Sequence, residues 1–493
     1  MTFDQVEATG PVSLAGALDM TFINSYVPPA GTSFDIIVGS LVTGTFTDVT
    51  ITNGPDIHLV YYPNRVTAVV GIGPFPYTFL GNTANDQFGN SVATAGDVDG
   101  DGVPDLIVGA YLDDNNGTDS GSAYVYSGAT GVQLYRFDGD TAGDQFGYSV
   151  SGAGDVNGDG RADLIVGAPL DDATGTDAGS AYLYSGATGA LLFSLHGSAA
   201  SDQFGVSVSG AGDVNLDGRA DIVAGAHLDD APGVDQGSAW IYSGADGSLI
   251  RTLMGAAAGD RFGRAVSKLA DVTGDGVPEL IVGAWYDDDQ GTNSGSAFVF
   301  DGATGAQLFV LKPSAASAET YFGGSVADAG DVNGDGFHDV LVGAQYDDDK
   351  GTDSGSAWVF SGANGDLLFK LLGEGAGDQF GRSVASTGDL NGDGRADFMV
   401  GAPLDDNSGT DAGSDGALLY VLDGGTAGDQ FGYSLASDFD SNGDGAKDWI
   451  VGIPFDDPHG ADSGSARVFQ GGDNTASISG TVQLEGQTDH SGV

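Results

Sequence analysis

A nine-residue acidic loop recurs along the chain, and its residue types are those of a calcium site. The first copy, DVDGDGVPD, runs from Asp97 to Asp105 and fits the pattern Asp-x-[Asp/Asn/Thr]-x-Asp-Gly-x-x-[Asp/Glu]. Ca²⁺ takes six to eight oxygen ligands at about 2.4 Å, and one tight loop can supply them from carboxylates at positions 1, 3 and 5, a carbonyl at position 7 and a further carboxylate. Glycine at position 6 permits the sharp turn. The spacing therefore predicts a cation site.

The chain contains seven copies of this loop, so we expect up to seven Ca²⁺ ions. Position 7 would contribute its main-chain carbonyl, which leaves its side chain free to vary. The candidate ligands at positions 1, 3, 5, 7 and 9 are, copy by copy, Asp97, Asp99, Asp101, Val103 and Asp105; Asp155, Asn157, Asp159, Arg161 and Asp163; Asp213, Asn215, Asp217, Arg219 and Asp221; Asp271, Thr273, Asp275, Val277 and Glu279; Asp331, Asn333, Asp335, Phe337 and Asp339; Asp389, Asn391, Asp393, Arg395 and Asp397; Asp440, Asn442, Asp444, Ala446 and Asp448.

These loops differ from EF-hands in the residue that would complete the coordination. An EF-hand places a bidentate Glu at position 12, where this chain has only Val or Ala, so we expect position 9 to be the closing ligand. One such loop could be a solvated turn, but seven in register between equivalent segments favour a metal site. The copies are unequal, because Thr273 and Glu279 weaken the fourth match and Leu216 replaces a glycine in the third. Mg²⁺ is disfavoured, since it keeps several waters.

The loops belong to an internal repeat marked by the dipeptide Phe-Gly. Its spacing is 58 residues in four intervals, 60 in one and 51 in the last, and a fixed period of this kind is typical of propellers and solenoids. In the second unit, FGYSVSGAG, LIVGA, SAYLYSG and LLFSLHG each predict a strand, and no segment predicts a helix. The Phe-Gly copies begin at Phe88, Phe146, Phe204, Phe262, Phe322, Phe380 and Phe431.

Four strands per unit predict an all-β fold: a seven-bladed β-propeller of four-stranded antiparallel blades over residues 76–472. We expect LIVGA, apolar throughout, to be an inner strand. Residues 1–75 predict a β-rich flank from a separate module, and 473–493 the start of a truncated one. Residues 77–81 are expected to supply the outer strand of the last blade, with 477–484 as the alternative. The sixth blade, shorter by seven residues, is expected to have three strands or a deletion.

The Phe-Gly dipeptide, the acidic loop and the following Val-Gly-Ala-Pro resemble the FG-GAP repeats that form the propeller of integrin α chains. The match covers residues 77–472. The resemblance implies calcium between the first and second strands of each blade and a binding face on the opposite side. It also implies an extracellular or cell-surface module for binding or adhesion, whose partner would be a protein or glycan. Nothing of the integrin legs is visible, so the resemblance supports the module and not the receptor.

A second set of acidic residues recurs eight positions after each loop. It consists of pairs such as Asp113 and Asp114, expected on the face opposite the calcium loops and beside the Asp of each Asp-Gln-Phe-Gly turn. One interpretation is a carboxylate ring for a cationic partner or further metal; the other is a rim of turn-forming residues. The repeated Phe and Trp240, Trp285 and Trp358 are interpreted as packing residues more readily than as a ligand cage.

The charge excludes several classes of partner. The 493 residues include 70 acidic and 15 basic side chains, for a net charge of −55, whereas nucleic acids and anionic lipids require clustered Lys and Arg. Cysteine is absent, which removes disulfides and thiolate chemistry. No apolar run reaches the ~18 residues of a membrane span. The first ten residues lack signal-peptide features, so either the protein is cytosolic or its true start is missing.

Catalysis has little support in the sequence. The six histidines occupy no repeated position, and neither a nucleophile elbow nor a zinc motif is present. We therefore expect no enzyme. The alternatives are the propeller portion of a polysaccharide-processing enzyme, because propellers can host active sites in their central channel, and a purely structural spacer.

Overall fold

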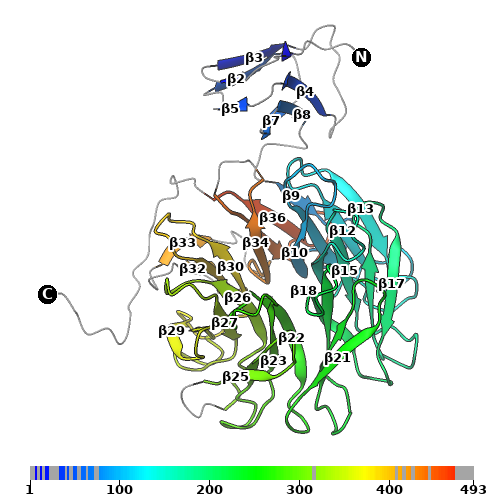
Figure 1. The fold of residues 1–493 in the computed structure, drawn as a ribbon, viewed down its shortest axis with the longest axis vertical. Coiled ribbons are helices and arrows are strands. Elements are labelled where there is room, and N and C mark those ends of the chain that lie inside the picture. Colours follow the sequence, from blue (N-terminus) through cyan, green and yellow to red (C-terminus); the bar gives the residue numbers. More distant parts are fainter. Residues whose placement is uncertain are drawn as a thin grey trace, which may run out of the picture.

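The computed structural model describes residues 77–313, 318–405, 428–441 and 446–471, together with the backbone of strands β1–β8, β32 and β33. All regular elements in this part of the chain are strands (Figure 1). Among the same residues, no helix has the length and apolar character needed to cross a membrane.

The main body is a propeller of four-stranded antiparallel blades, which confirms the predicted fold class. Six blades are each built from four consecutive strands, paired in chain order. Their strands are β10 (Ser91–Gly96), β11 (Asp105–Ala110), β12 (Ser122–Tyr126) and β13 (Gln133–Asp138); β14 (Ser149–Gly154), β15 (Asp163–Ala168), β16 (Ser180–Tyr184) and β17 (Leu191–His196); β18 (Phe204–Gly212), β19 (Asp221–Ala226), β20 (Ser238–Tyr242) and β21 (Leu249–Met254); β22 (Phe262–Leu269), β23 (Glu279–Ala284), β24 (Ser296–Phe300) and β25 (Gln307–Leu311); β26 (Ser325–Gly330), β27 (Asp339–Ala344), β28 (Ser356–Phe360) and β29 (Leu367–Leu372); β30 (Ser383–Gly388), β31 (Asp397–Gly401), β32 (Gly409–Ala412) and β33 (Leu418–Leu422).

The remaining blade joins the two ends of the ring. It pairs β34 (Ser434–Phe439), β35 (Asp448–Ile453) and β36 (Ser465–Phe469) with β9 (Thr78–Leu80), and Phe79 lies opposite Ala466. β10 also lies against β34 (Figure 1). The prediction that residues 77–81 supply the outer strand is thus confirmed, while the alternative segment 477–484 lies outside the described residues.

The sixth blade has four strands, so the expectation of three was wrong. Its third strand, β32, consists of GTDA and pairs Thr410 with Val400 of β31. The same letters at residues 175–178 of the second blade lie in the loop before the third strand. The shorter sequence therefore forms its third strand from residues that are loop elsewhere.

The N-terminal segment is also β-rich, as the sequence predicted. It contains one four-stranded sheet and two parallel strand pairs, and the domain boundary near residue 76 stays a prediction. The sheet is β1 (Val6–Glu7), β4 (Ser33–Val38), β8 (Arg65–Val70) and β7 (Ile57–Tyr62); the pairs are β2 (Val12–Ser13) with β5 (Val42–Thr43) and β3 (Ala17–Thr21) with β6 (Asp48–Thr52).

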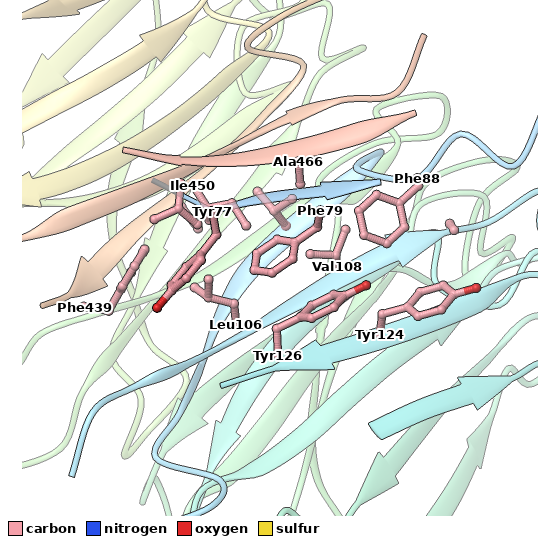
Figure 2. Close-up of a cluster of buried hydrophobic side chains, with 14 residues drawn as sticks. Tyr77, Phe79, Phe88, Leu106, Val108, Tyr124, Tyr126, Phe439, Ile450 and Ala466 are labelled. Atoms are coloured by element: carbon pink, nitrogen blue, oxygen red, sulfur yellow. The ribbon is translucent and has the colours of Figure 1, made fainter. Parts of the chain in front are cut away.

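The core lies between neighbouring blades. Every position of β11 is buried, as its apolar sequence predicts for an inner strand. In six of the blades the Phe of the Phe-Gly dipeptide packs on an aromatic ring of the third strand, and the ring centroids of Phe88 and Tyr124 are 5.4 Å apart. Figure 2 shows how Phe79 of the closing blade stacks on Tyr126 of the next, at 4.0 Å. Interleaved rings of this kind hold successive blades in a fixed orientation.

Serine hydroxyls bond the first strands of adjacent blades around the ring. Ser149 Oγ donates to the carbonyl of Gly205 at 2.8 Å, and Ser434 Oγ donates to Gly89 at 2.8 Å, across the point where the ends of the propeller meet. The carbonyl belongs to the Gly of the next Phe-Gly dipeptide, whose φ of +86° at Gly205 requires glycine. The Ser434 bond therefore links the last blade to the first.

Replacement of Ser434 by Ala is expected to lower the free energy of unfolding by about 1 kcal/mol, because the Gly89 carbonyl loses its donor. Chemical unfolding measures this change. The matched control is Ser267→Ala, since Ser267 Oγ bonds only the neighbouring Lys268 carbonyl of its own strand. An equal effect of the two substitutions would argue against a special role in ring closure.

Candidate metal centres between the first and second strands

The acidic loops lie where the sequence predicted, between the first and second strands of each blade. The first follows β10 and ends at Asp105, the first residue of β11. In the last copy, residues 442–445 lie outside the described residues, so the candidates Asn442 and Asp444 have no structural account. The shared position gives every blade the same acidic loop at one end of its strands.

In the first loop, three carboxylates converge. One oxygen from each of Asp97, Asp99 and Asp105 lies within 4.8 Å of the others. Oxygen ligands at this separation suit a hard divalent cation. The other copies have Asn or Thr at position 3, so they bring together fewer charges but the same kind of oxygen donor.

Position 1 organises the loop around itself. Asp155 Oδ1 accepts hydrogen bonds from the main-chain N–H of Gly158 at 2.6 Å and of Asp159 at 3.1 Å, and its Oδ2 accepts from Gly160 at 2.9 Å. The third, fifth and sixth copies repeat the Oδ1 bond to position 5 and the Oδ2 bond to position 6. The loop is therefore shaped by its own carboxylate.

Positions 3 and 5 form consecutive turns of the Asx type. Asn157 Oδ1 accepts from Asp159 N–H at 2.9 Å, and Asp159 Oδ1 accepts from Arg161 N–H at 2.9 Å. The intervening residue adopts a positive φ, +76° at Gly158, which glycine tolerates. In the third copy Leu216 adopts φ +60° at this position with its side chain exposed, a strained conformation for a leucine.

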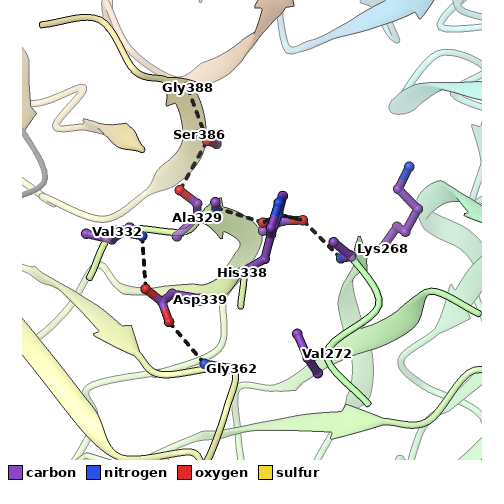
Figure 3. A network of polar contacts seen from close by, with 12 residues as sticks. Lys268, Val272, Ala329, Val332, His338, Asp339, Gly362, Ser386 and Gly388 are labelled. Atoms are coloured by element: carbon purple, nitrogen blue, oxygen red, sulfur yellow. Dashed lines mark hydrogen bonds and ion pairs between the residues drawn. The ribbon is translucent and has the colours of Figure 1, made fainter. Parts of the chain in front are cut away.

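Position 9 has a structural role that the sequence did not reveal. Asp339 is fully buried; its Oδ2 accepts from the N–H groups of Val332 at 3.0 Å and Asn333 at 3.3 Å, and its Oδ1 accepts from Gly362 at 3.1 Å (Figure 3). Gly362 lies in the turn between the third and fourth strands, so this carboxylate ties the acidic loop to the far half of the blade. That it also closes the coordination of a metal stays a prediction.

The same anchor occurs in other blades. The equivalent carboxylates are buried. They accept hydrogen bonds from described main-chain N–H groups at loop positions 2 and 3, and most also accept one from the N–H of a glycine that lies 23 residues after the carboxylate. The glycine at constant spacing is the sequence signal that could have identified the role. These carboxylates are Asp105, Asp163, Asp221 and Asp448. Glu279 and Asp397 likewise accept N–H groups from positions 2 and 3 of their loops.

Position 7 connects neighbouring loops through its side chain, where the sequence pointed only to its carbonyl. Arg161 Nη1 lies 4.0 Å from Asp97 Oδ1 of the preceding blade. Arg219 Nη1 donates to the carbonyl of Val156, again in the preceding loop, at 3.3 Å. The first and second acidic loops are thus each in contact with an arginine side chain from the next blade.

Burial raises the pKa of several position-9 carboxyl groups. It raises the pKa of Asp105 to about 8, with the charge of Asp99 adding to the effect, and the pKa of Asp221, Asp339 and Asp448 to about 6. Burial outweighs the hydrogen bonds from main-chain N–H groups, which act in the opposite direction. A cation in these loops would reverse the balance, because it favours the ionised form.

Without calcium, the propeller is expected to be more stable near pH ~5 than near pH ~8. A carboxyl group whose pKa is raised on folding contributes stability below its ordinary pKa of 3.8, and this contribution is lost as the pH rises through about 6 for Asp221 and about 8 for Asp105. Saturating calcium should flatten or invert the trend. Unfolding midpoints at both pH values check this; a midpoint of the calcium-free protein that increases with pH would contradict it.

The acidic pairs on the other loops mostly serve the local fold. Asp113 is buried and accepts from Asn115 N–H at 3.0 Å and from the Tyr124 hydroxyl at 2.5 Å. Asp114 accepts from the N–H of Asp119, which adopts φ +53°. The pairs at residues 171, 229, 287, 347 and 456 follow this arrangement, with a buried or half-buried first Asp and a second Asp that bonds the N–H five residues onward. The interpretation as turn-forming residues is favoured.

The turn carboxylates lie beside these pairs, as expected. The Asp144 carbonyl accepts from Leu170 N–H at 3.3 Å, and burial together with the charge of Asp171 raises the pKa of Asp144 to about 7. This turn is therefore packed against the loop between the second and third strands of its own blade.

Of the tryptophans interpreted above as packing residues, Trp240 and Trp358 pack within blades and Trp285 does not. Trp240 and Trp358 each make an edge contact with a Phe-Gly phenylalanine, at 5.8 Å between ring centroids. Trp285 lies in the loop after β23, half-buried against Tyr286 and Tyr321. The packing interpretation holds for the first two residues.

The described histidines lie on four different blades. His196 Nδ1 is 2.7 Å from Ser180 Oγ, His338 Nδ1 is 2.9 Å from Asp328, and His459 Nδ1 is 2.8 Å from the Gly81 carbonyl. His227 is buried in the loop after β19. Within the part of the chain that the structure describes, these imidazoles do not share a site.

Comparison with known families and proteins identifies the repeat. Two family profiles, both described as FG-GAP repeat, match six segments that together cover about half of the chain and correspond to individual blades. The segments are residues 146–184, 204–242, 323–360 and 380–418 for one profile and 81–126 and 252–300 for the other.

Similar curated proteins are integrin α chains. Integrin alpha-V of Gallus gallus is 32% identical over 217 residues, which cover 41% of this chain and 20% of the relative. Integrin alpha-5 of Xenopus laevis is 29% identical over 273 residues, 50% of this chain and 24% of the relative. Integrin alpha-11 of Homo sapiens is 34% identical over 161 residues, which cover 30% of this chain and 13% of the relative. The matches thus span a quarter or less of each relative.

Proposed function

We propose that this chain, which belongs to the FG-GAP repeat family and forms an integrin α-like propeller, is a calcium-binding module for binding or adhesion outside the cell. The observation that carries the proposal is the repeated acidic loop, in which position 1 collects main-chain N–H groups and position 9 anchors the loop to its blade. Extracellular calcium, at millimolar concentration, is available to sites of even modest affinity.

Calcium would act mainly on the rigidity of the module. The loops hold 22 of the 70 acidic residues at one end of the strands, and each bound ion would neutralise part of a repelling cluster. Rigid blades would then keep the loops on the opposite face in a fixed arrangement, which lowers the entropic cost of binding a partner. No catalytic step is assigned, and the module would form part of a longer chain.

The experiment is a binding screen of the intact chain against immobilised matrix proteins and glycans, in millimolar calcium and after chelation. We expect calcium-dependent retention of at least one extracellular ligand. A variant with Asp159 and Asp217 both replaced by Asn should bind more weakly, whereas the paired control Arg136→Gln, at an exposed ion pair on an outer strand, should not. Retention that is indifferent to calcium, or no retention, would contradict the proposal.

A further inference from the structure

Blade four carries a group of cationic and aromatic side chains that the repeat does not require. We call it the Trp285 patch, and it consists of Arg261, Arg264, Trp285, Tyr286 and Tyr321. By strand order, the patch lies on the face opposite the acidic loops, where the turns before β22 and β26 meet the loop after β23. All five side chains are half-buried, so each retains some exposed surface.

The rings of the patch meet edge to face. The centroids of Trp285, Tyr286 and Tyr321 are 5.0 to 5.6 Å apart, with interplanar angles of 55° to 64°. Arg264 Cζ lies 4.9 Å from the centroid of Trp285, and Arg261 Cζ lies 4.2 Å from that of Tyr286. Each guanidinium group therefore lies over one face of its ring, and a ligand would pack on the face that the guanidinium group does not cover.

Some polar groups in and beside the patch make no hydrogen bond or ion pair with other described residues. Among the described residues, no carboxylate oxygen lies within 4.0 Å of Arg264, although the chain has 70 acidic residues. Arg261, in contrast, lies 3.8 Å from Asp235. The ring nitrogens Trp285 Nε1 and His227 Nδ1, both shielded from solvent, have no hydrogen-bond partner in the same part of the structure. Ser296 Oγ and Thr387 Oγ1 are in the same state elsewhere in the fold, so the two ring nitrogens support a binding site here only together with Arg264.

Comparison with the other blades shows that Trp285 is local to this blade, although Arg382, which is equivalent to Arg264, also lies over an aromatic ring, 4.3 Å from the centroid of Tyr433. The residue equivalent to Trp285 is Tyr, Pro, His or Gln elsewhere. In the next blade the residue after Phe-Gly is Gly324, and a Cβ there would lie 3.9 Å from the Trp285 ring. The absence of a side chain at Gly324 leaves that side of the ring uncovered. Since the other blades fold without these residues, they are available for recognition.

We propose that the Trp285 patch binds a saccharide that carries a carboxylate. Arg264 would pair with the carboxylate through two parallel N–H donors, and the aromatic faces would pack on the sugar ring. The exposed ring faces favour a sugar over an acidic peptide, which would need the cations alone. This assignment rests on the proposed role as a binding module and names the class of ligand and the site.

The test is a calorimetric titration of the calcium-loaded chain with tetragalacturonate, at equal free calcium in cell and syringe. The wild-type chain should bind the probe, and the fully methyl-esterified probe should bind at least about 10-fold more weakly because it lacks the charge. Arg264→Gln and Trp285→Ala should each weaken binding about 10-fold or more. Arg264→Lys, which keeps the charge but not the planar fork, should fall between. Arg136→Gln, distant from the patch, should have no effect.

Several results would overturn the assignment. They are equal affinity for the charged and esterified probes, unchanged affinity in Arg264→Gln, tighter binding of poly-glutamate, and no binding at millimolar probe. Melting curves establish that the variants are folded, and the comparison of the two probes on the wild-type chain needs no variant. If the screen above finds a neutral ligand while the uronate does not bind, only this inference fails. If no calcium-dependent ligand is found, the proposed function fails instead.

Discussion

Removing calcium from the intact chain is expected to lower its melting temperature by several degrees. Each acidic loop places three or four carboxyl groups in one turn, so the calcium-free fold contains repeated clusters of like charge. A site filled about 100-fold above its dissociation constant adds ~2.7 kcal/mol to the free energy of unfolding, and several such sites add together where blades are independent. Each kcal/mol corresponds to about 2 to 4 °C in a large domain.

Melting curves in millimolar calcium, in excess chelator, and in magnesium at the same ionic strength measure the effect. Calcium should stabilise most, because magnesium prefers retained waters to a cage of protein oxygens. Equal stabilisation by both ions would point to general charge screening. An unchanged melting temperature on chelation would contradict the calcium assignment.

Replacement of the position-9 carboxylate is expected to be the most damaging single change in a loop. Asp163→Ala would leave three main-chain N–H groups, of Val156, Asn157 and Gly186, without their acceptor in a fully buried site. Each unsatisfied buried donor costs ~1 to 3 kcal/mol. We expect a loss of about 3 kcal/mol or more in the free energy of unfolding, with or without calcium.

The matched control is Asp159→Asn in the same loop. Asp159 is exposed and accepts only the N–H of Arg161, a bond that an Asn carbonyl can keep. This variant should retain its stability in chelator but lose one calcium per chain and part of the stabilisation by calcium. Equal destabilisation of the two variants in chelator would show that position 9 is no special anchor.

The overall fold was predictable because it repeats. A Phe-Gly dipeptide every 58 residues and an apolar Leu-Ile-Val-Gly-Ala strand recur in register, and even the closing strand at 77–81 could be inferred from a segment that precedes the first repeat as outer strands precede the others. The sixth blade was predicted wrongly because its third strand forms from GTDA at residues 409–412. These residues form a strand because they pair with β31, and their local sequence pattern does not predict one.

Part of the candidate site could not be read from local spacing. The anchoring role of Asp163 depends on Gly186, which is 23 residues away in sequence, and the reach of Arg161 to Asp97 depends on how two blades meet. The acidic pairs suggested a second charged ring, but the first Asp of each described pair is drawn into bonds such as that from Tyr124 to Asp113. Contacts of this kind appear only once the chain is folded.

The acidic composition is therefore a patterned one. The nine-residue acidic loops and the loops between the second and third strands together hold 43 of the 70 acidic residues, at opposite ends of the strands. In the first set, three carboxylates of the first loop lie close enough together to hold a cation, and in the other set the first Asp of each described pair is bonded within the fold. Against this background, Arg264, which has no carboxylate within 4.0 Å among the described residues, is the residue that we propose for binding an anion.

The most direct measurement of the central claim is the calcium stoichiometry of the intact chain, by equilibrium dialysis against millimolar calcium and metal analysis. We predict several ions per chain, up to the seven that the loops would hold, and one fewer in Asp159→Asn. A chain that binds no calcium under these conditions, or whose stoichiometry does not change in Asp159→Asn, would contradict the account.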